Sequence, residues 1–305
     1  MTIQLVDFAE VERWIPARCG RLHAIELVHE GPWATVWRLA LDTRVAWFKV
    51  CAAMKAFEPR LTGELYARWS DRVSEVLARD DERRWLLLAD GGTAARLLGN
   101  PPELWLATLP RYAELQRGEA AHAAEHVQHG VPDLRAATWA ARYEELLRHY
   151  LPLEEHQVQL LAQLGPRFAE LCEQLAAHQL PDTVQHDDLH MNNLYAKDNH
   201  LRVLDWGDSS ISHPFVSVVV TFRFLEEFNQ LPPDDRWYAR LRDAYLEPWG
   251  AGMRDAFALA MRVGGLVHCF GWMRQRDALP VVTHESFDVG FRIVLRRAIA
   301  LLQSE

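Results

Sequence analysis

The sequence predicts an α+β fold with two unequal lobes, a small β-rich N-terminal lobe and a larger helical C-terminal lobe. Three observations lead to this expectation. Short apolar runs rich in β-branched and aromatic residues fill the chain up to residue 90. Apolar residues at helical spacing dominate after residue 100. One short β-like island, over 183–203, interrupts the helices and is rich in Asp, His and Asn.

The first lobe is expected to contain five strands and one helix. Apolar runs separated by polar turns indicate the strands, and the second and third runs form a hairpin. Leu61, Leu65 and Trp69 recur at every fourth position, which indicates one face of a helix over 57–69. Asp90 and the two glycines after it are typical of a flexible connection. The expected strands span 22–29, 37–41, 45–50, 73–77 and 84–89.

The second lobe is expected to be mainly helical. Asn100 followed by two prolines is typical of a helix start, with a capping side chain and Pro in the first turn. Gly165 and Pro166 predict a break inside a longer helical stretch. We therefore expect one lobe over 1–90, a hinge near 88–92 and a second lobe over 93–305. The expected helices span 100–127, 136–150, 154–179, 255–276 and 286–302.

The composition is typical of a globular cytoplasmic protein. The chain has 305 residues, of which 49% are hydrophobic and 25% charged, and its net charge is −9. This charge argues against a nucleic-acid partner, and it is compatible with a cationic small substrate as well as with an ordinary acidic surface. No unbroken apolar run reaches the roughly 18 residues of a membrane helix, so no membrane partner is expected. The four cysteines are scattered, which indicates reduced thiols.

The polar residues that carry chemistry cluster around Asp188. Four residues separate it from Asn193, which opens a hairpin predicted over 193–204. A hairpin of this length returns Asp205 close to Asn193. Carboxylate and amide oxygens suit Mg²⁺, which takes one or two protein ligands and the rest from phosphates and water. The pattern predicts phosphoryl transfer, with Asp188 accepting the proton of the attacking hydroxyl and Asn193 and Asp205 binding Mg²⁺.

This segment resembles the aminoglycoside phosphotransferase and choline kinase superfamily, whose fold is like that of protein kinases. The family loop reads H-G-D-x-H-x-x-N, and His186, Asp188, His190 and Asn193 match it. The I-D-W or I-D-F segment that follows in the family is matched by Asp205 and the Trp after it. The resemblance implies that Asp188 is the catalytic base, that Asn193 and Asp205 hold Mg²⁺, and that ATP, with GTP as the alternative, donates the phosphate. His186 is expected to pack and hydrogen-bond so that it holds the catalytic loop.

The resemblance extends to a lysine on the third predicted strand. Lys49, in an apolar run, looks like the family lysine that contacts the α- and β-phosphates. Glu64, fifteen positions further along (64 − 49), resembles its partner glutamate. Glu58 is the rival for this role, but it precedes Pro59 and so lies in the first helical turn at best. We therefore expect Lys49 to pair with Glu64.

Two backbone segments resemble the nucleotide-binding parts of the family. The segment 30–35 looks like the nucleotide loop, which places Gly31 against the phosphates. The segment 85–92 looks like the hinge, which places backbone groups such as those of Ala89 against adenine. Both assignments are implied by the resemblance.

The chain departs from the family pattern at three places. Asp187 stands where the family has Gly between His and Asp, and Met191-Asn192 stand where it has Pro-Gly. The nucleotide loop has one glycine, Gly31, and not a G-x-G-x-x-G run. A second carboxylate beside Asp188 raises its pKa if both face the same way. In an extended loop the two side chains face apart, and we expect that arrangement.

The main prediction is an ATP-dependent kinase that phosphorylates a hydroxyl of a small molecule, whose identity the helical lobe does not reveal. The alternative is a catalytically silent nucleotide-binding pseudokinase with a regulatory role, which Asp187 and the single-glycine loop favour. A protein kinase is disfavoured because no A-P-E segment follows and 208–213 is too short for an activation loop. His186 and His190, four apart, also fit a zinc or HD-type hydrolase, but that spacing belongs to helices and this segment leads into a hairpin.

Overall fold

The computed structural model describes residues 6–304, which divide into two compact units. The chain up to Asn100, together with His129–Val131 and Met191–Gly207, forms the first unit. Pro101–Gln128, Pro132–His190 and the chain from Asp208 onward form the second. The hairpin after the Asp188 loop thus belongs to the first unit, and the boundary expected near residues 88–92 stays a prediction.

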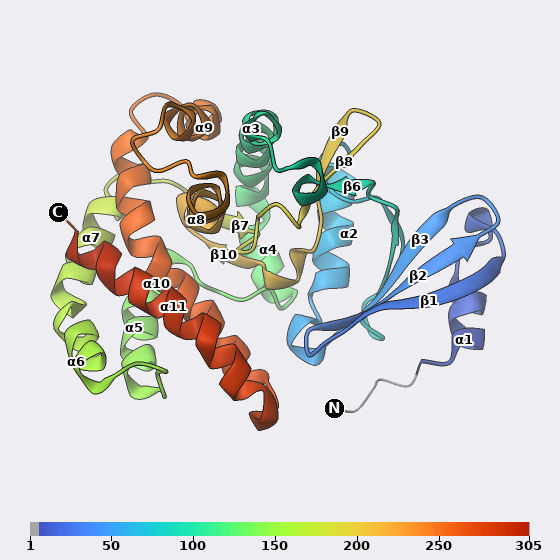
Figure 1. Ribbon diagram of the computed structural model, residues 1–305, viewed down its shortest axis with the longest axis horizontal. Helices are drawn as coiled ribbons and strands as arrows, with labels where there is room; N and C mark the ends of the chain where they lie inside the picture. Colours follow the sequence, from blue (N-terminus) through green and yellow to red (C-terminus); the bar gives the residue numbers. More distant parts are fainter. Residues whose placement is uncertain (1–5, 305) are drawn as a thin grey trace. The chain divides into compact units, whose positions relative to one another are not determined.

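A five-stranded antiparallel sheet with strand order β1-β2-β3-β5-β4 forms the centre of the first unit (Figure 1). The predicted hairpin of the second and third strands is confirmed, since β2 and β3 pair in antiparallel register. The helices are α1 (Phe8–Trp14), which the sequence did not predict, and α2 (Glu58–Arg68). The strands are β1 (Leu22–Glu30), β2 (Ala34–Leu41), β3 (Val45–Cys51), β4 (Val76–Asp80) and β5 (Trp85–Ala89).

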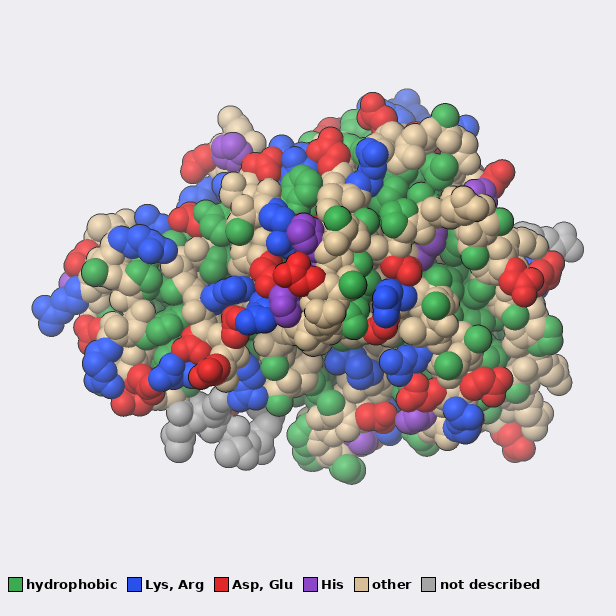
Figure 2. Space-filling view, turned by 180° about the vertical axis from the view of Figure 1, so that it is seen from behind, with side chains coloured by type: hydrophobic (Ala, Val, Ile, Leu, Met, Phe, Trp, Pro, Cys, Tyr) green, Lys and Arg blue, Asp and Glu red, His purple; other side chains and the backbone are tan. Residues whose placement is uncertain are grey.

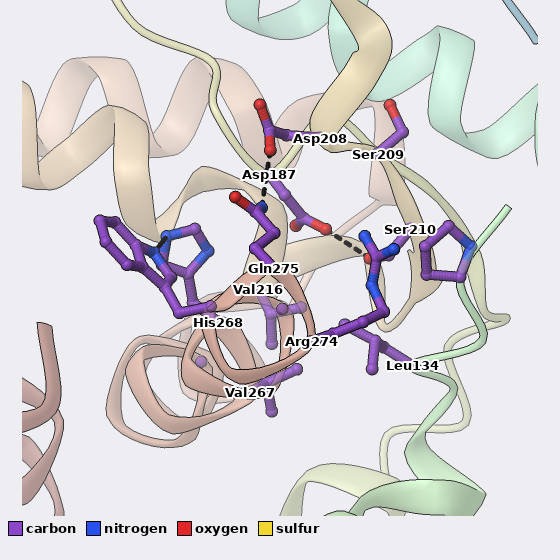
Figure 3. Close-up of a pocket in the computed structure, with 14 residues that line it drawn as sticks. Leu134, Asp187, Asp208, Ser209, Ser210, Val216, Val267, His268, Arg274 and Gln275 are labelled. Carbon is purple, nitrogen blue, oxygen red and sulfur yellow. Dashed lines mark hydrogen bonds between the residues drawn. The ribbon is translucent and has the colours of Figure 1, made fainter. Parts of the chain in front are cut away.

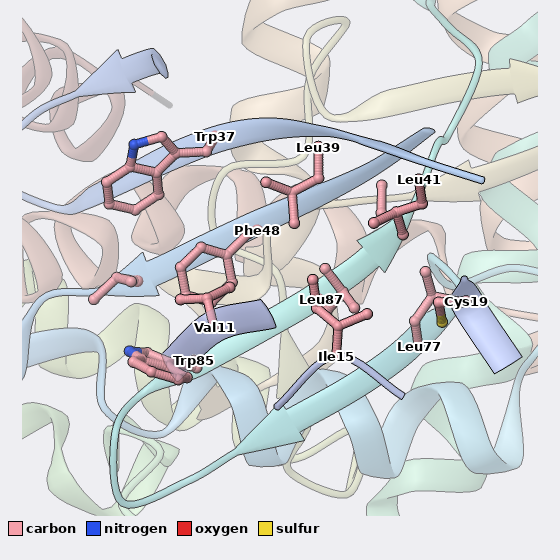
Figure 4. Close-up of a cluster of buried hydrophobic side chains, with 12 residues drawn as sticks. Val11, Ile15, Cys19, Trp37, Leu39, Leu41, Phe48, Leu77, Trp85 and Leu87 are labelled. Carbon is pink, nitrogen blue, oxygen red and sulfur yellow. The ribbon is translucent and has the colours of Figure 1, made fainter. Parts of the chain in front are cut away.

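One face of this sheet is packed with aromatic and aliphatic side chains that also contact α1 (Figure 4). Phe48 lies at its centre, 5.3 Å from the ring of Trp85 and 5.5 Å from that of Trp37. Since side chains alternate along a strand, Phe48 and Val50 in this core place Lys49 on the opposite face of the sheet. The core packing therefore determines the direction in which the lysine of β3 points.

A second, smaller sheet of the first unit has the strand order β6-β8-β9. The hairpin expected over 193–204 is confirmed within one residue at each strand, and Leu194 pairs with Val203. Val203 also forms an isolated parallel bridge with Val73. Val73 is the first residue of the strand predicted at 73–77, and it pairs here with the hairpin. Strand β4 begins at Val76, three residues after the predicted start. The strands are β6 (Thr93–Ala94), β8 (Leu194–Lys197) and β9 (His200–Val203).

The second unit consists mainly of helices, with one two-stranded antiparallel sheet. The central helix α10 (Arg254–Ala278) packs along α11 (His284–Gln303), as Figure 1 shows. By length and composition α10 could span a membrane, but 61% of its most apolar window is buried inside the protein, as in the core helix of a globular unit. The remaining elements are α3 (Pro102–Glu119), α4 (Ala123–Gln128), α5 (Trp139–Arg148), α6 (Glu155–Gln163), α7 (Gly165–Ala176), β7 (Thr183–Gln185), β10 (Ser210–Ser212), α8 (Val218–Asn229) and α9 (Arg236–Leu246).

Several sequence predictions for the second unit are confirmed and others are wrong. The break at Gly165 is confirmed, because α6 ends before it and α7 begins there. The capping role of Asn100 is wrong: it adopts a left-handed backbone (φ 50°), and Pro101 occupies the cap position without a side-chain hydrogen bond. Helices α8 and α9 were not predicted. Figure 2 shows acidic and basic side chains interspersed across one face of the molecule, so the net charge is not gathered there in one area.

Candidate active site

Lys49 holds two carboxylates of the first unit together. Its Nζ lies 2.6 Å from Oε1 of Glu58 and 2.7 Å from Oδ1 of Asp205. Glu58 is the first residue of α2 and only 1% exposed. The predicted pairing of Lys49 with Glu64 is wrong, since Oε1 of Glu64 instead lies 3.2 Å from Nδ1 of His129. Six residues along a helix rotate a side chain by about 240° around the axis, so the two glutamates point to different neighbours.

The position of Pro59 explains why Glu58 can take this place. Pro is tolerated in the first turn of a helix, where its missing N–H would have no partner. α2 therefore starts at Glu58 in spite of the proline, and its first turn follows β3 closely enough for Glu58 to meet Lys49. Pro59 was the sequence signal for the Lys49–Glu58 contact, because a proline in the first turn marks the start of a helix.

The charges around Lys49 stabilise one another. Burial opposes the charge of Lys49, but the carboxylates of Asp205 and Glu58 outweigh that effect and raise the pKa of Lys49 well above its usual value. Burial also raises the pKa of Glu58, against the attraction of Lys49. The thiol of Cys51 donates to Oε2 of Glu58 at 3.3 Å, and burial raises the pKa of Cys51, so it stays a thiol. Lys49 is thus a fixed, permanently charged ammonium group.

Asn193 and Asp205 lie at the same end of the β8–β9 hairpin, as the hairpin length predicts. The backbone N–H of Leu204 donates to the carbonyl oxygen of Asn193 at 2.9 Å, which holds the two strand ends together. Asp205 has a left-handed backbone (φ 64°), and its side chain is 52% exposed. One exposed carboxylate and one amide oxygen on a single hairpin are a donor set that fits Mg²⁺, a hard ion needing few protein ligands. Between residues 6 and 304 no cluster of three or more His, Cys, Asp or Glu is placed to hold a metal.

Gly207 lies against Glu58. A Cβ atom at this glycine would stand 2.7 Å from Oε2 of Glu58 and 3.4 Å from Oδ1 of Asp205. Contacts below 3.0 Å require something to move. The indole of Trp206 is fully buried beside it and donates to the carbonyl of Val203 at 3.3 Å. The absence of a side chain at residue 207 therefore permits the close approach of this turn to the carboxylate that holds Lys49.

In the second unit, β7 leads into a loop in which Asp188 is accessible and His186 is not. His186 is 0% exposed, and its Nδ1 accepts the backbone N–H of Asp188 at 3.3 Å. The backbone N–H of His186 in turn lies 3.0 Å from Oη of Tyr112. The side chain of Asp188 is 39% exposed, with Oδ2 3.4 Å from Nε2 of His190. His186 thus positions Asp188 from inside the unit, while the Asp188 carboxylate can reach a ligand.

Asp187 turns away from Asp188 into a small cavity. Its backbone is left-handed (φ 60°), a conformation that glycine adopts freely and aspartate tolerates better than most residues. This explains why an aspartate can stand where the family loop has glycine. Its Oδ2 accepts a hydrogen bond from the hydroxyl of Ser210 on β10. Burial raises the pKa of Asp187 to about 7, and the nearby Asp208 and Asp188 add to this. The expectation that the two aspartates face different neighbours is confirmed.

The cavity beside Asp187 has a volume of about 20 Å³, room for roughly one water. Its wall combines charged, polar and aromatic groups of β10 and α10 (Figure 3). Nε2 of Gln275 donates to Oδ1 of Asp208 at 2.7 Å, and Nε1 of Trp272 donates to Nε2 of His268 at 2.8 Å. No sequence pattern predicts this network, because its members lie far apart along the chain.

Two segments are expected to bind the nucleotide through backbone groups. In both of them, other parts of the protein already lie against the expected binding residue. Gly31 lies in the turn between β1 and β2, and a Cβ atom there would stand 2.6 Å from Nε2 of His29. Ala89 ends β5, and its N–H donates to the carbonyl of Glu75 at 2.9 Å. The Ala89 amide is therefore already used by the protein.

Solved structures of small-molecule kinases share this fold. The choline kinase LicA from Streptococcus pneumoniae matches with a TM-score of 0.63 and 11% identity over 96% of this chain and 98% of that one. A choline/ethanolamine kinase family protein from Mesorhizobium loti matches with a TM-score of 0.57 and 16% identity over 97% and 95%. A thermostable mutant of the aminoglycoside phosphotransferase APH(4)-Ia, in a ternary complex with AMP-PNP and hygromycin B, matches with a TM-score of 0.61 and 12% identity over 97% and 99%. At these identities the likeness concerns the fold.

The chain therefore has the fold of these kinases. Residues 59–257, more than half of the chain, match the Phosphotransferase enzyme family (APH), and the protein belongs to that family. The match begins one residue after Glu58, so Lys49 and Glu58 lie outside it, and the contact between them is established by geometry. No curated protein matches the sequence.

Proposed function

We propose that the protein transfers the γ-phosphoryl group of ATP, or alternatively of GTP, to a hydroxyl group of a small molecule. The observation that carries this proposal is the contact of Lys49 with both Glu58 and Asp205. It supplies a fixed cation for phosphates beside an exposed carboxylate suited to a metal ion. Positioning and charge neutralisation of this kind account for most of the catalysis of phosphoryl transfer.

Each residue has a defined part in the proposed reaction. Asp188 takes the hydroxyl proton as a bond forms between the acceptor oxygen and the γ-phosphorus. The bond from that phosphorus to its bridging oxygen breaks, and ADP leaves with the electron pair. His186 holds Asp188 in place from behind. Lys49 contacts the phosphates, and Gly31 and Ala89 offer backbone groups to the nucleotide. Asn193 and Asp205 would hold Mg²⁺, which when bound neutralises phosphate charge.

The acceptor is a small molecule, as for relatives named choline kinase and aminoglycoside phosphotransferase. Four free cysteines in the described chain are in keeping with a reducing, cytoplasmic location. The competing function is nucleotide binding without turnover, which the carboxylate at residue 187 favours. We rank it second because Lys49, Asp188, Asn193 and Asp205 are all present.

The experiment that tests the proposal is a thermal-shift titration with ATP, with and without Mg²⁺. Ligands that bind the native state raise its apparent stability by mass action, by about 2.7 kcal/mol at a hundredfold excess over Kd. Wild type should show a Mg²⁺-dependent shift that Asp205→Ala loses. Asp198→Ala, in the turn of the same hairpin, serves as the matched control and should retain it. If wild type gives no shift with ATP or GTP, the kinase assignment must be withdrawn.

A further inference from the structure

Helix α8 flanks the loop that carries Asp188. Oγ1 of Thr221 donates to the carbonyl of Leu189 at 2.7 Å. The ring of Phe224 lies 4.5 Å from the ring of His190, whose Nε2 is 3.4 Å from Oδ2 of Asp188. The first two turns of α8 therefore form a wall beside the proposed base, and side chains on this wall are placed to touch the acceptor.

Arg223 belongs to this wall. Its guanidinium carbon lies 5.1 Å from the ring centroid of Phe224, and its charge interacts with that of Glu227 and, less strongly, with that of Asp188. Its Nε is buried and has no hydrogen-bond partner. Within the part of the chain that the structure describes, Arg223 forms no ion pair. Burial accordingly lowers the pKa of Arg223, which nevertheless stays charged at any ordinary pH.

Among the described residues of α8 and α10, no carboxylate forms an ion pair with Arg223. Glu226 and Glu227 on α8 are both engaged by Arg297 of α11, the second at 3.4 Å. From α10, His268 and Cys269 face Arg223. Burial lowers the pKa of His268 to about 4 and raises that of Cys269, so both are neutral at pH 7. A partly buried cation without a partner is costly, and a ligand anion that pairs with it removes that cost.

We propose that Arg223 binds an anionic group, a carboxylate or a phosphate, on the alcohol whose hydroxyl Asp188 deprotonates. The inference rests on the proposed function and specifies its acceptor class as hydroxy acids or phosphorylated alcohols. An anionic acceptor takes the place of the cationic acceptor that the net charge allows. The charges within reach of the acceptor determine its binding more than the net charge of the whole protein does. The planar guanidinium suits either anion, since it donates two parallel hydrogen bonds to carboxylate or phosphate oxygens.

Isothermal titration calorimetry on the full chain, saturated with Mg²⁺ and AMP-PNP, tests the inference. The probes are glycerate, glycerol 3-phosphate and neutral glycerol, which share a hydroxyl-bearing skeleton. Wild type should bind at least one of the two anions at least tenfold more tightly than glycerol, and the tighter one identifies the group. Arg223→Gln should remove that preference. Arg240→Gln, which removes an arginine stacked 4.1 Å over Trp237 on α9, should retain it.

A charge-conserving variant and the binding of AMP-PNP itself distinguish the possible results of this titration. Arg223→Lys keeps the charge and should retain part of the preference, which separates recognition from misfolding. Equal binding of the three probes to wild type, or equal losses for anion and glycerol in Arg223→Gln, would overturn the inference. If AMP-PNP itself fails to bind wild type, the proposed function fails. If AMP-PNP binds and the anions do not, only the acceptor assignment is lost.

Discussion

Nζ of Lys49 lies 2.6 Å from Oε1 of Glu58, a residue of the first turn of α2, whereas Glu64 further along the same helix contacts His129. The lysine of the central sheet is therefore anchored where α2 begins. Its second contact, with Asp205, connects the sheet to the β8–β9 hairpin. Two elements close in sequence, β3 and α2, and the distant β8–β9 hairpin thus meet at one ammonium group.

Replacing Glu58 should destabilise the protein far more than replacing Glu64. Removing one partner of a buried ion pair costs about 3–5 kcal/mol, and because Lys49 keeps Asp205 we expect about 2–3 kcal/mol for Glu58→Gln. Glu64→Gln loses a more exposed contact and should cost less than about 1 kcal/mol. Urea unfolding of both variants measures the difference. Equal losses would contradict the assignment of Glu58 as the partner of Lys49.

A methyl group at residue 207 should disturb the same ion pair. The Cβ atom of Gly207→Ala would stand 2.7 Å from Oε2 of Glu58, and overpacking of this kind costs about 1–3 kcal/mol. We expect a lower melting temperature together with weaker binding of Mg²⁺-ATP. Gly271→Ala is the control, since a Cβ atom there meets nothing within 4 Å and Ala is the better helix former. A melting temperature of Gly207→Ala at or above that of wild type would refute the close approach.

Loss of the proposed base should affect turnover and leave nucleotide binding intact. Asp188→Asn keeps the shape of the side chain but cannot take up a proton, so kcat should fall by about 10²- to 10⁴-fold. Release of ADP in steady state, with an accepted alcohol or with water, gives the rate. Asp182→Asn, just before β7, should turn over normally. Near-normal turnover by Asp188→Asn would remove this residue from the mechanism.

The stability of wild type relative to Asp187→Asn should fall with rising pH. The pKa of Asp187 is raised from 3.8 to about 7, so the native protein holds this proton more tightly than the unfolded chain. The stabilisation is complete below about pH 4 and is lost as the pH rises through 7. At about 1.4 kcal/mol per pH unit, the difference in unfolding free energy between the two proteins should change by about 2–3 kcal/mol between pH 5 and pH 8. Parallel curves for the two proteins would show that Asp187 is ionised throughout.

The sequence was sufficient for the five-stranded sheet and α2 of the first unit and for the β8–β9 hairpin. Alternating apolar residues specify which face of a strand is buried, and this alone directed Lys49 away from the core. A hairpin of known length specifies which residues meet at its ends, as Asn193 and Leu204 do. These features depend on local periodicity, which a single sequence contains.

Features that depend on tertiary contacts could not be predicted in this way. Helix α8 opens with Val218, Val219, Val220 and Thr221, β-branched residues that favour a strand and are helical here because all four are buried. Within residues 6–304, Arg223 forms no ion pair because Arg297, on α11, pairs with the two glutamates of α8. The choice between Glu58 and Glu64 required the orientation of α2 relative to β3, which spacing along the chain does not define.

The double contact of Lys49 has a thermodynamic consequence for any phosphate ligand. A phosphate that binds this ammonium group competes with Asp205 for its charge, so association weakens one charge–charge contact as it forms another. The measured affinity will then be the difference between two charge–charge interactions of similar size. Added salt weakens both, and we expect the affinity to depend less on ionic strength than the number of charges involved would indicate.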